Sequence, residues 1–327
     1  MESLVAVTGA DGFIGSHLVE LLVQRGHRVR ALAQYNSFGS WGWLDTLDPE
    51  VMAQVEVQLG DVRDPGSMRA LVDGAQAVHH LAALIAIPYS YQAPRSYVET
   101  NVLGTMNVLE ACRDAETPRI VHTSTSETYG TALTVPIAET HPLQTQSPYA
   151  ASKAGGDKLA ESYHLSFGLP VVTLRPFNTF GPRQSARAFI PTVISQIAAG
   201  ATTVKVGSLE PTRDFTFVKD TAAAFYAAAT TDGIEGGLFN AGVGGEVSMG
   251  ELAETIAATM GRDVEFVSET QRRRPAGSEV LRLVCDSSKF QAATGWKPAH
   301  TLEDGLAETI TWLTGNLDRY RPGVYAV

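Results

Sequence analysis

The sequence predicts an α/β fold in which a doubly wound parallel sheet is followed by a smaller C-terminal α/β domain. Two observations lead to this fold class. In the first half of the chain, short apolar runs alternate with longer runs whose apolar residues recur at helical spacing, and strands joined by crossover helices form parallel sheets. The second half has more glycine and proline and shorter elements, which indicates a separate and less regular domain.

The elements of the first half follow in order from these runs. Buried strands are expected where apolar side chains are nearly continuous, at residues 4–7, 28–33, 55–59, 77–81, 119–123 and 171–175. Helices are expected where apolar side chains recur every three or four positions, at residues 14–25, 97–113 and 148–167. These elements alternate along the chain as a doubly wound sheet requires.

The second half is expected to contain helices at residues 192–199, 221–229, 249–260 and 302–313. We place the domain boundary at residue 176, so that the first domain covers residues 1–176 and the second covers residues 177–327. Segments near residues 214–243 are expected to return to the first domain. The sequence contains no internal repeats and no low-complexity tracts.

Composition and charge exclude several classes of protein. A hydrophobic fraction of 44% with 18% charged residues is typical of a folded globular chain. The formal net charge of −10 repels phosphate backbones, so nucleic acid is not an expected partner. The two cysteines are too few for a disulfide framework, and the eight histidines show no metal-binding spacing. Because the sequence shows no leader and no membrane-spanning stretch, a cytoplasmic protein without a membrane partner is expected.

A glycine-rich turn joins the first strand to the first helix. The segment V-A-V-T-G-A-D-G-F-I-G (5–15) contains three evenly spaced glycines. Gly9 permits a tight turn, Gly12 lets the backbone approach a pyrophosphate, and Gly15 lets helix and strand pack closely. The N–H groups that begin the helix can then bind phosphate oxygens, so the pattern predicts a Rossmann-type dinucleotide site. The other loop residues expected to contact the cofactor are Asp11, Phe13 and Ile14.

The choice between NAD and NADP stays open in the sequence. An acidic residue at the end of the second strand usually binds the adenosine ribose and selects NAD. Here the strand ends in A-Q-Y-N (33–36), and no arginine follows at once that would accept a 2′-phosphate. Asp61 and Val62 follow the third strand and would meet the adenine, although a turn or helix cap before Asp64 explains them almost equally well. We take NAD as the expected cofactor and leave NADP open.

Two polar segments supply the candidate chemistry. The stretch H-T-S-T-S-E-T-Y-G (122–130) follows a predicted strand, and open α/β sheets bind ligands at the carboxyl ends of their strands. Tyr149 and Lys153 are one turn apart on the same face of a predicted helix. A nearby Lys⁺ and a nicotinamide cation favour the phenolate, so a lowered pKa is expected for Tyr149. Such a tyrosine can take the proton of an alcohol while the same carbon gives up hydride.

These motifs resemble those of the extended short-chain dehydrogenase/reductase family, which contains the nucleotide-sugar epimerases and dehydratases. The matching segments are T-G-A-D-G-F-I-G-S-H-L (8–18), H-L-A-A (80–83), S-T-S-E-T-Y-G (124–130), Y-A-A-S-K (149–153), R-P-F-N-T-F-G-P-R (175–183) and R-D-F-T-F-V-K-D (213–220). They follow the family order over nearly the whole chain. Three further segments, 36–45, 181–191 and 211–215, are most similar to NAD-dependent 4,6-dehydratases of N-acetylglucosamine nucleotides in legionaminic-acid-type pathways.

The resemblance implies a reaction and a role for each segment. Tyr149, supported by Lys153 and Thr125, would be the base for the sugar 4-hydroxyl while hydride leaves carbon 4. Glu127 would then remove the proton from carbon 5, the 6-hydroxyl would leave, and hydride would return to carbon 6. The further cofactor contacts implied are Leu81, Ala82, Ala83 and Asn101. The substrate contacts implied are Asn178, Arg213 and Arg282 at the diphosphate, and Pro88, Tyr89 and Ser90 at the sugar.

One departure from the dehydratase pattern keeps other reactions open. Many hexose 4,6-dehydratases have Asp-Glu where this chain has Ser126 and Glu127. Because serine is a poor acid, Glu127 would act in both steps or through a water. The same Ser-Glu pair occurs in enzymes that resemble UDP-glucuronate decarboxylases, for which Arg187 or Arg282 would face the sugar carboxylate. Simple 4-epimerases usually have small or neutral residues at both positions, which argues against an epimerase.

The remaining alternatives concern the class of protein and its partners. A non-catalytic dinucleotide-binding protein would have no need of Tyr149, Lys153 and Glu127 together. The substrate would be a UDP- or GDP-linked sugar, and the sequence leaves the base open. The family resemblance implies a homodimer formed by the helices at residues 97–113 and 148–167. For the basic triplet at residues 272–274 a solvated loop is favoured over a ligand contact.

Overall fold

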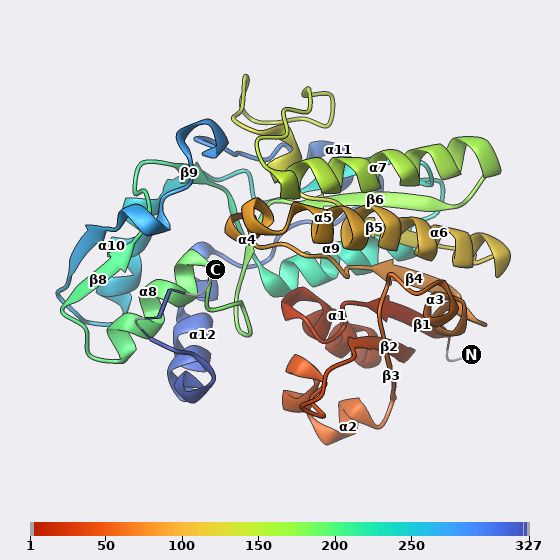
Figure 1. Cartoon of the computed structure of the whole chain (residues 1–327), viewed down its shortest axis with the longest axis horizontal. Coiled ribbons are helices and arrows are strands. Elements are labelled where there is room, and N and C mark those ends of the chain that lie inside the picture. Colours follow the sequence, from red (N-terminus) through yellow and green to blue (C-terminus); the bar gives the residue numbers. More distant parts are fainter. Residues whose placement is uncertain (1–2, 323, 326–327) are drawn as a thin grey trace.

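The computed structural model describes residues 3–322 and 324–325, and a seven-stranded parallel sheet is its central layer (Figure 1). In their order across the sheet the strands are β11 (Leu238–Ala241), β6 (Val171–Pro176), β5 (Ile120–Thr123), β4 (Ala77–His80), β1 (Leu4–Thr8), β2 (Arg28–Gln34) and β3 (Val55–Gly60). The chain builds outward from β1 in both directions, which is the doubly wound arrangement that the sequence predicts.

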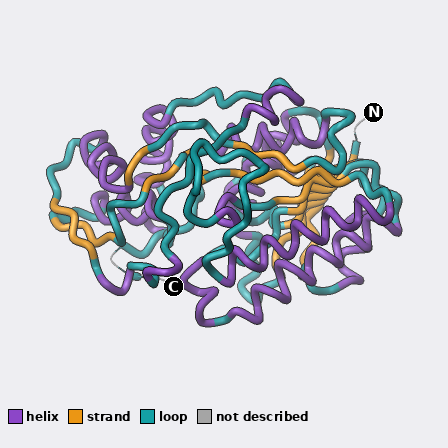
Figure 2. Tube along the Cα trace, turned by 90° about the horizontal axis from the view of Figure 1, so that it is seen from above, coloured by secondary structure: helices purple, strands orange, loops and turns teal. Residues whose placement is uncertain are grey.

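Helices cover both faces of this sheet (Figures 1 and 2). One face is packed by α1 (Phe13–Gln24) and α9 (Val218–Thr230), which also contact each other. The opposite face is packed by α3 (Pro65–Val72), α6 (Gly104–Asp114) and α7 (Pro148–Phe167). Four shorter helices lie in the connections and near the C-terminal region: α2 (Pro49–Met52), α4 (Ile87–Gln92), α5 (Pro94–Tyr97) and α11 (Ser288–Thr294).

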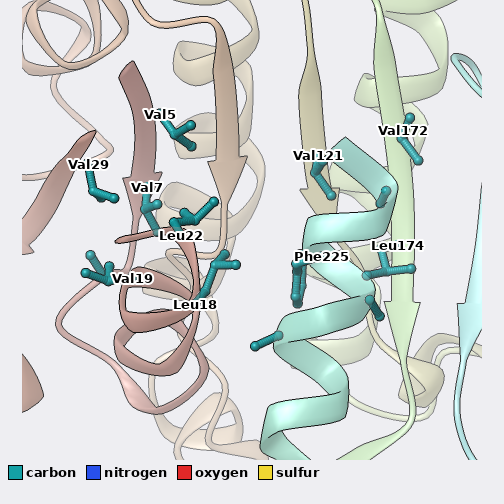
Figure 3. Packing of buried hydrophobic residues seen from close by; sticks show 14 of the residues in the cluster. Val5, Val7, Leu18, Val19, Leu22, Val29, Val121, Val172, Leu174 and Phe225 are labelled. Carbon is teal, nitrogen blue, oxygen red and sulfur yellow. The ribbon is translucent and has the colours of Figure 1, made fainter. Parts of the chain in front are cut away.

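Figure 3 shows the core on the face covered by α1 and α9. Val5 and Val7 of β1 lie near Leu18 and Leu22 of α1, and none of the four is more than 3% exposed. Phe225 of α9 is fully buried over β5 and β6. Burial of one side chain of this kind contributes about 1.5–3 kcal/mol. Since α9 and β11 come from residues 214–243, this segment completes the sheet and its core, while the division at residue 176 stays a prediction.

A second apolar core lies to one side of the sheet (Figure 1). It is formed mainly by α8 (Phe189–Ala198), α10 (Met249–Thr259) and α12 (Leu302–Gly315). Three two-stranded sheets complete this region: β7 (Asn178–Phe180) with β10 (Phe215–Phe217), β9 (Thr212–Arg213) with β12 (Val247–Ser248), and β8 (Thr203–Val206) with β13 (Glu265–Ser268). β7 and β9 carry residues that the sequence assigns to substrate binding.

The helix predicted at residues 97–113 is broken in the structure. α5 ends at Tyr97, a π-helical turn covers Val98–Leu103, and α6 begins at Gly104. Within that turn Asn101 is buried, and its side chain binds the main-chain N and O of Leu84 at 2.8 and 2.9 Å. Amphipathic spacing does not distinguish such a turn from regular helix, so the prediction of one continuous helix is wrong.

Within the described ranges, no helix is long and apolar enough to cross a membrane. The same residues contain no group of three or more His, Cys, Asp and Glu side chains arranged to hold a metal ion.

Candidate active site

The loop after β4 is joined to the end of β1. The hydroxyl oxygen of Thr8 accepts hydrogen bonds from the main-chain N–H groups of Leu81 and Ala82, both at 3.0 Å. The same oxygen lies 2.9 Å from Nδ1 of His80. Ala83 follows, and the loop from residue 81 to residue 83 is partly exposed. The segments that carry the glycine turn and the H-L-A-A motif therefore form one continuous surface.

The glycine turn leaves room beside the start of α1. Gly9 has a φ of +66°, and a Cβ there would lie 2.8 Å from the N atom of Ala82. A Cβ on Gly15 would overlap the carbonyl oxygen of Gly9. Gly12 is the N-cap and supplies no side-chain cap, so the N–H groups of the first turn are left for a ligand. The residues of that turn are Phe13, Ile14 and Gly15. This cradle fits the pyrophosphate of a dinucleotide.

The two residues after β3 lie in a turn. Asp61 accepts hydrogen bonds from the side chain of Arg63 at 2.5–3.0 Å and from its main-chain N–H at 2.9 Å. The side-chain hydrogen bond from Arg63 lowers the pKa of Asp61. Val62 is buried, and its carbonyl accepts a hydrogen bond from Asn107 at 3.0 Å. A turn therefore explains Asp61 as the sequence allows, and a contact with adenine stays a prediction.

Tyr149 and Lys153 occupy the first two turns of α7, where the sequence places them. Ser147 caps this helix and accepts a hydrogen bond from the N–H of Ala150 at 3.1 Å. Both side chains are buried, Tyr149 at 8% and Lys153 at 3% exposure. The Lys153 ammonium donates a hydrogen bond to the carbonyl of Thr123 at 2.5 Å. The helix thus carries the candidate catalytic pair under the loop that follows β5.

The pKa of Tyr149 is raised in this structure, and the lowering expected from Lys153 together with a nicotinamide cation stays a prediction. Burial raises the pKa of Tyr149, a side-chain hydrogen bond with Thr125 acts in the opposite direction, and the charge of Glu127 raises it further. Burial also lowers the pKa of Lys153 to about 8, against the raising effect of Asp157. Removal from water disfavours the phenolate and the ammonium alike, and residue spacing in a sequence does not reveal this cost.

A buried polar network lies one turn further along α7. Asp157 accepts hydrogen bonds from Arg175 and Ser124, each at 2.6 Å, and lies 3.1 Å from Nε2 of His122. Burial alone would raise the pKa of Asp157, but the hydrogen bond with His122 and the charge of Arg175 hold it below its ordinary value. The network keeps a negative charge four residues from Lys153, which favours the ammonium form of that side chain.

Glu127 is a buried carboxylate in the loop after β5. It lies in a 3₁₀ turn that begins at Ser126, and the Thr125 hydroxyl accepts a hydrogen bond from its N–H at 3.3 Å. Ser126 and Glu127 are 2% and 8% exposed. One carboxylate oxygen of Glu127 lies 3.4 Å from Nη1 of Arg274. The loop therefore brings a carboxylate into the same site as the Tyr149 phenol, as its influence on the pKa of Tyr149 reflects.

Two arginines lie on the other side of Glu127. Arg213 and Arg274 both approach Oε1 of Glu279, at 3.6 and 3.8 Å. Burial lowers the pKa of Arg213, the charge of Glu127 raises it, and the charge of Arg274 lowers it. An arginine pair of this kind suits the oxygens of a diphosphate.

The favoured interpretation of residues 272–274 as a solvated loop is wrong for Arg274. In the structure Arg272 forms an ion pair with Glu269, Arg273 binds Ser268, and Arg274 enters the site with its side chain 25% exposed. All three residues of the triplet are arginine, so only tertiary packing places their side chains in different surroundings. The sequence contains no signal that distinguishes the third arginine.

The remaining arginines and amides of the predicted substrate set differ in their surroundings. Nδ2 of Asn178 is buried without a hydrogen-bond partner in the described part of the chain, which fits a group that awaits a ligand. Arg282 is half exposed and forms two hydrogen bonds of 2.6 Å with Glu246. Arg187 is exposed, and its charge opposes the effect of burial, which raises the pKa of Tyr97 to about 12. Substrate contacts of these residues stay predictions.

α4 carries the three residues assigned to the sugar. Pro88 and Tyr89 are partly exposed, whereas Ser90 is buried and donates a hydrogen bond to the carbonyl of Ile87 at 2.7 Å. The next residue, Tyr91, lies 2.6 Å from the hydroxyl of Ser278 and so joins α4 to the segment that follows Arg274. Asn101 holds the loop at Leu84, and its amide also donates to Ser152 at 2.9 Å, so it positions the loop and α7 relative to each other.

Comparison with known proteins gives a consistent result. The family model described as GDP-mannose 4,6 dehydratase matches residues 6–309. A dTDP-glucose 4,6-dehydratase from Actinoplanes sp. is 32% identical over 95% of this chain and 98% of its own. The structure is similar to that of the dTDP-glucose 4,6-dehydratase DesIV from Streptomyces venezuelae with NAD bound, with a TM-score of 0.85, 29% identity and coverage of 97% and 99%.

A third similar protein has a different activity. The UDP-N-acetylglucosamine 4-epimerase from Methanobrevibacter ruminantium, solved in complex with UDP-N-acetylmuramic acid, has a TM-score of 0.86 and 30% identity over 97% of this chain and 100% of its own. The glycine cradle, the Tyr149 and Lys153 pair and the family match over most of the chain agree with one another. The chain therefore belongs to the GDP-mannose 4,6-dehydratase family of extended short-chain dehydrogenases/reductases.

Proposed function

We propose that this chain is a nucleotide-sugar 4,6-dehydratase that uses NAD and acts on an NDP-linked N-acetylglucosamine. The observation that carries the proposal is the buried carboxylate of Glu127 in the same site as Tyr149 and Lys153. Dehydration needs a base for an alcohol and a second base for a carbon acid, and Tyr149 and Glu127 supply both. The NAD-bound relative and the cradle at Gly9 support NAD as the cofactor.

Oxidation at carbon 4 of the sugar needs a base on its hydroxyl. Tyr149 takes that proton, and the side chain of Thr125 acts to lower the pKa of the phenol. Burial raises the pKa of Tyr149, so this step depends on positive charge nearby, and Lys153 is the cation one turn further along α7. NAD, when bound, accepts the hydride and later returns it. The remaining chemistry belongs to the protein side chains.

Elimination at carbons 5 and 6 follows from the ketone at carbon 4. The ketone acidifies the proton on carbon 5, and Glu127 removes it. Glu127 gives this proton to the departing 6-hydroxyl, which leaves as water, because Ser126 is a poor acid. When hydride adds to carbon 6, carbon 5 takes up a proton from solvent through Glu127. Arg274 balances the carboxylate charge at 3.4 Å, and with Arg213 it binds the substrate diphosphate.

Epimerisation at carbon 4 is the second candidate, because a solved relative is a UDP-N-acetylglucosamine 4-epimerase. That reaction uses the Tyr149 and Lys153 pair but needs no base for carbon 5, so Glu127 favours dehydration. Decarboxylation of a uronic acid nucleotide needs a cation beside the sugar carboxylate. Arg274 next to Glu127 meets that need, whereas Arg282 is already bound by Glu246.

The test is product mass after incubation with UDP- and GDP-linked N-acetylglucosamine, dTDP-glucose and UDP-glucuronate. We expect one of the two N-acetylglucosamine nucleotides to lose one water without net consumption of NAD. Loss of water from dTDP-glucose alone would keep dehydration and overturn the proposed sugar. A 4-epimer of unchanged mass would replace dehydration by epimerisation, and release of carbon dioxide from UDP-glucuronate would replace it by decarboxylation. Glu127→Gln separates the steps, because it should still oxidise carbon 4 but should no longer exchange the carbon 5 proton with deuterated water.

A further inference from the structure

The end of β2 lacks the acidic residue that usually recognises the adenosine ribose. The strand closes with Gln34, and Tyr35 and Asn36 follow. In dinucleotide-binding folds a carboxylate at this point binds the ribose 2′-hydroxyl and so selects NAD. The sequence also lacks any lysine or arginine between Arg30 and Arg63, where a cation for a 2′-phosphate would be expected.

The structure brings a carboxylate to this point from another segment. Oδ2 of Asp11, in the glycine turn, accepts a hydrogen bond from the main-chain N–H of Gln34 at 3.0 Å. The carboxylate thus reaches the last residue of β2, although it comes from 23 residues earlier in the chain. In the part of the chain that the structure describes, Oδ1 of Asp11 makes no hydrogen bond to another residue. One carboxylate oxygen is therefore fixed and the other is available as an acceptor.

The backbone of Asp11 is fixed as well. Its carbonyl accepts a hydrogen bond from the N–H of Trp43 at 3.0 Å. Gly42 has a φ of +60°, and a Cβ there would lie 2.6 Å from the same carbonyl oxygen. The loop after β2 thus packs directly on Asp11, and its close approach requires glycine. A residue fixed at both its carboxylate and its main-chain carbonyl is preorganised to bind a ligand.

We propose that Asp11 selects NAD over NADP by accepting a hydrogen bond from the adenosine ribose 2′-hydroxyl, in place of the missing acid at the end of β2. The inference rests on the proposed use of a dinucleotide. A 2′-phosphate at the same point would bring a second negative charge next to the carboxylate. The loop adds Asp45 and Asp48 without a cation, and Arg63 is bound by Asp61. Attraction of the 2′-hydroxyl and repulsion of a 2′-phosphate both favour NAD over NADP.

The experiment measures the dissociation constants of NAD, NADP and the 2′-deoxyadenosine analogue of NAD by titration calorimetry on the full chain freed of nucleotide. For the wild type we expect NAD to bind about tenfold more tightly than the deoxy analogue and about a hundredfold more tightly than NADP. Asp11→Ala should abolish the difference between NAD and the analogue. Asp11→Asn, which keeps an acceptor but loses the charge, should mainly improve NADP binding.

Two controls test the assignment. Glu50→Gln removes the same charge from an exposed side chain of α2, the short helix that follows this loop, and should leave all ratios unchanged. Gln34→Ala removes the side chain at the end of β2, which is the other group that could bind the ribose 2′-hydroxyl. Equal affinity of the wild type for NAD and its deoxy analogue would overturn the inference even if the Asp11 variants did not fold. The inference would also be overturned if Gln34→Ala changed the affinity ratios between the dinucleotides and the Asp11 variants did not.

The two levels of the proposal fail differently. If NAD binds but the affinity ratios between the three dinucleotides do not change in the Asp11 variants, this inference is overturned and the proposed function stands. A wild type that binds none of the three dinucleotides would overturn both.

Discussion

The Tyr149 hydroxyl is the group on which the proposed oxidation depends. Tyr149→Phe keeps the buried ring and removes only the base, so we expect turnover to fall by about 10²- to 10⁴-fold with little change in thermal stability. Product formation followed by mass measures the loss. Tyr163→Phe is the matched control on the same helix, because its hydroxyl binds Glu110 away from the site, and it should keep full turnover. Equal turnover in Tyr149→Phe would refute the mechanism.

Lys153 illustrates a conflict between stability and function at a single residue. Its pKa is lowered by burial from 10.5 to about 8, so below pH 8 the folded chain holds a buried charge that the unfolded chain solvates more easily. Lys153→Met should therefore abolish turnover yet raise the free energy of unfolding at pH 7 by on the order of 1–3 kcal/mol.

The sign of the pH dependence follows from the same shift. Between pH 8 and 10.5 the unfolded chain binds more protons at Lys153 than the folded chain, so wild-type stability rises with pH in this window. The difference in the free energy of unfolding between Lys153→Met and the wild type should therefore be smaller at pH 9.5 than at pH 7, as measured by urea unfolding. A variant that is less stable than the wild type at pH 7 would contradict the assignment.

At the scale of elements, the contact between α1 and the glycine turn defines the dinucleotide cradle. Gly15→Ala places a methyl group on the carbonyl oxygen of Gly9, so the turn must shift, and we expect NAD affinity to fall by at least about tenfold. Gly250→Ala is the control, because its Cβ would meet Leu209 at an ordinary 3.6 Å within α10. Titration calorimetry with NAD compares the two, and equal affinities would show that the cradle tolerates the shift.

The elements that the sequence predicts well are those with local signals at both ends. α7 begins and ends at the predicted residues, because Ser147 caps its start, Pro148 follows, and Gly168 ends it in a left-handed conformation. The π-helical turn at Val98–Leu103 has no comparable local signal, since a buried contact with Leu84 accompanies it. Local rules thus recover most of the elements and miss a distortion associated with tertiary contact.

The same contrast applies to the site. The glycine turn and the pair of Tyr149 and Lys153 are short motifs, so the sequence alone identifies them. Arg274 and the position of Asp11 depend on loops that meet across many residues. The sequence reports that β2 ends without an acid, but only the fold shows which carboxylate lies there. Residue spacing therefore predicts which site residues a single element contains. Tertiary packing decides which residues of distant segments join them.

At the scale of the whole molecule, exposed apolar side chains lie on the two helical segments that the family resemblance assigns to a dimer. Val98 and Leu103 are 49% and 45% exposed beside α6, and Leu165 on α7 is 77% exposed. We predict a homodimer, and Leu103→Glu should shift it toward monomer in light scattering. Leu133→Glu, at an exposed site in a loop, should not. A monomeric wild type at working concentration would overturn the prediction.

β11 and α9 belong to the N-terminal sheet but come late in the chain, and this order affects biosynthesis. Until residue 241 leaves the ribosome, β6 lacks its outer neighbour and the apolar surface that Phe225 covers on β5 and β6 is open to water. At about 5–20 residues per second, a nascent chain that has completed β6 spends several seconds in this state. Its exposed strand edge and apolar face are features that chaperones bind and that promote aggregation. The N-terminal sheet of this protein is therefore completed only after most of the chain has been translated.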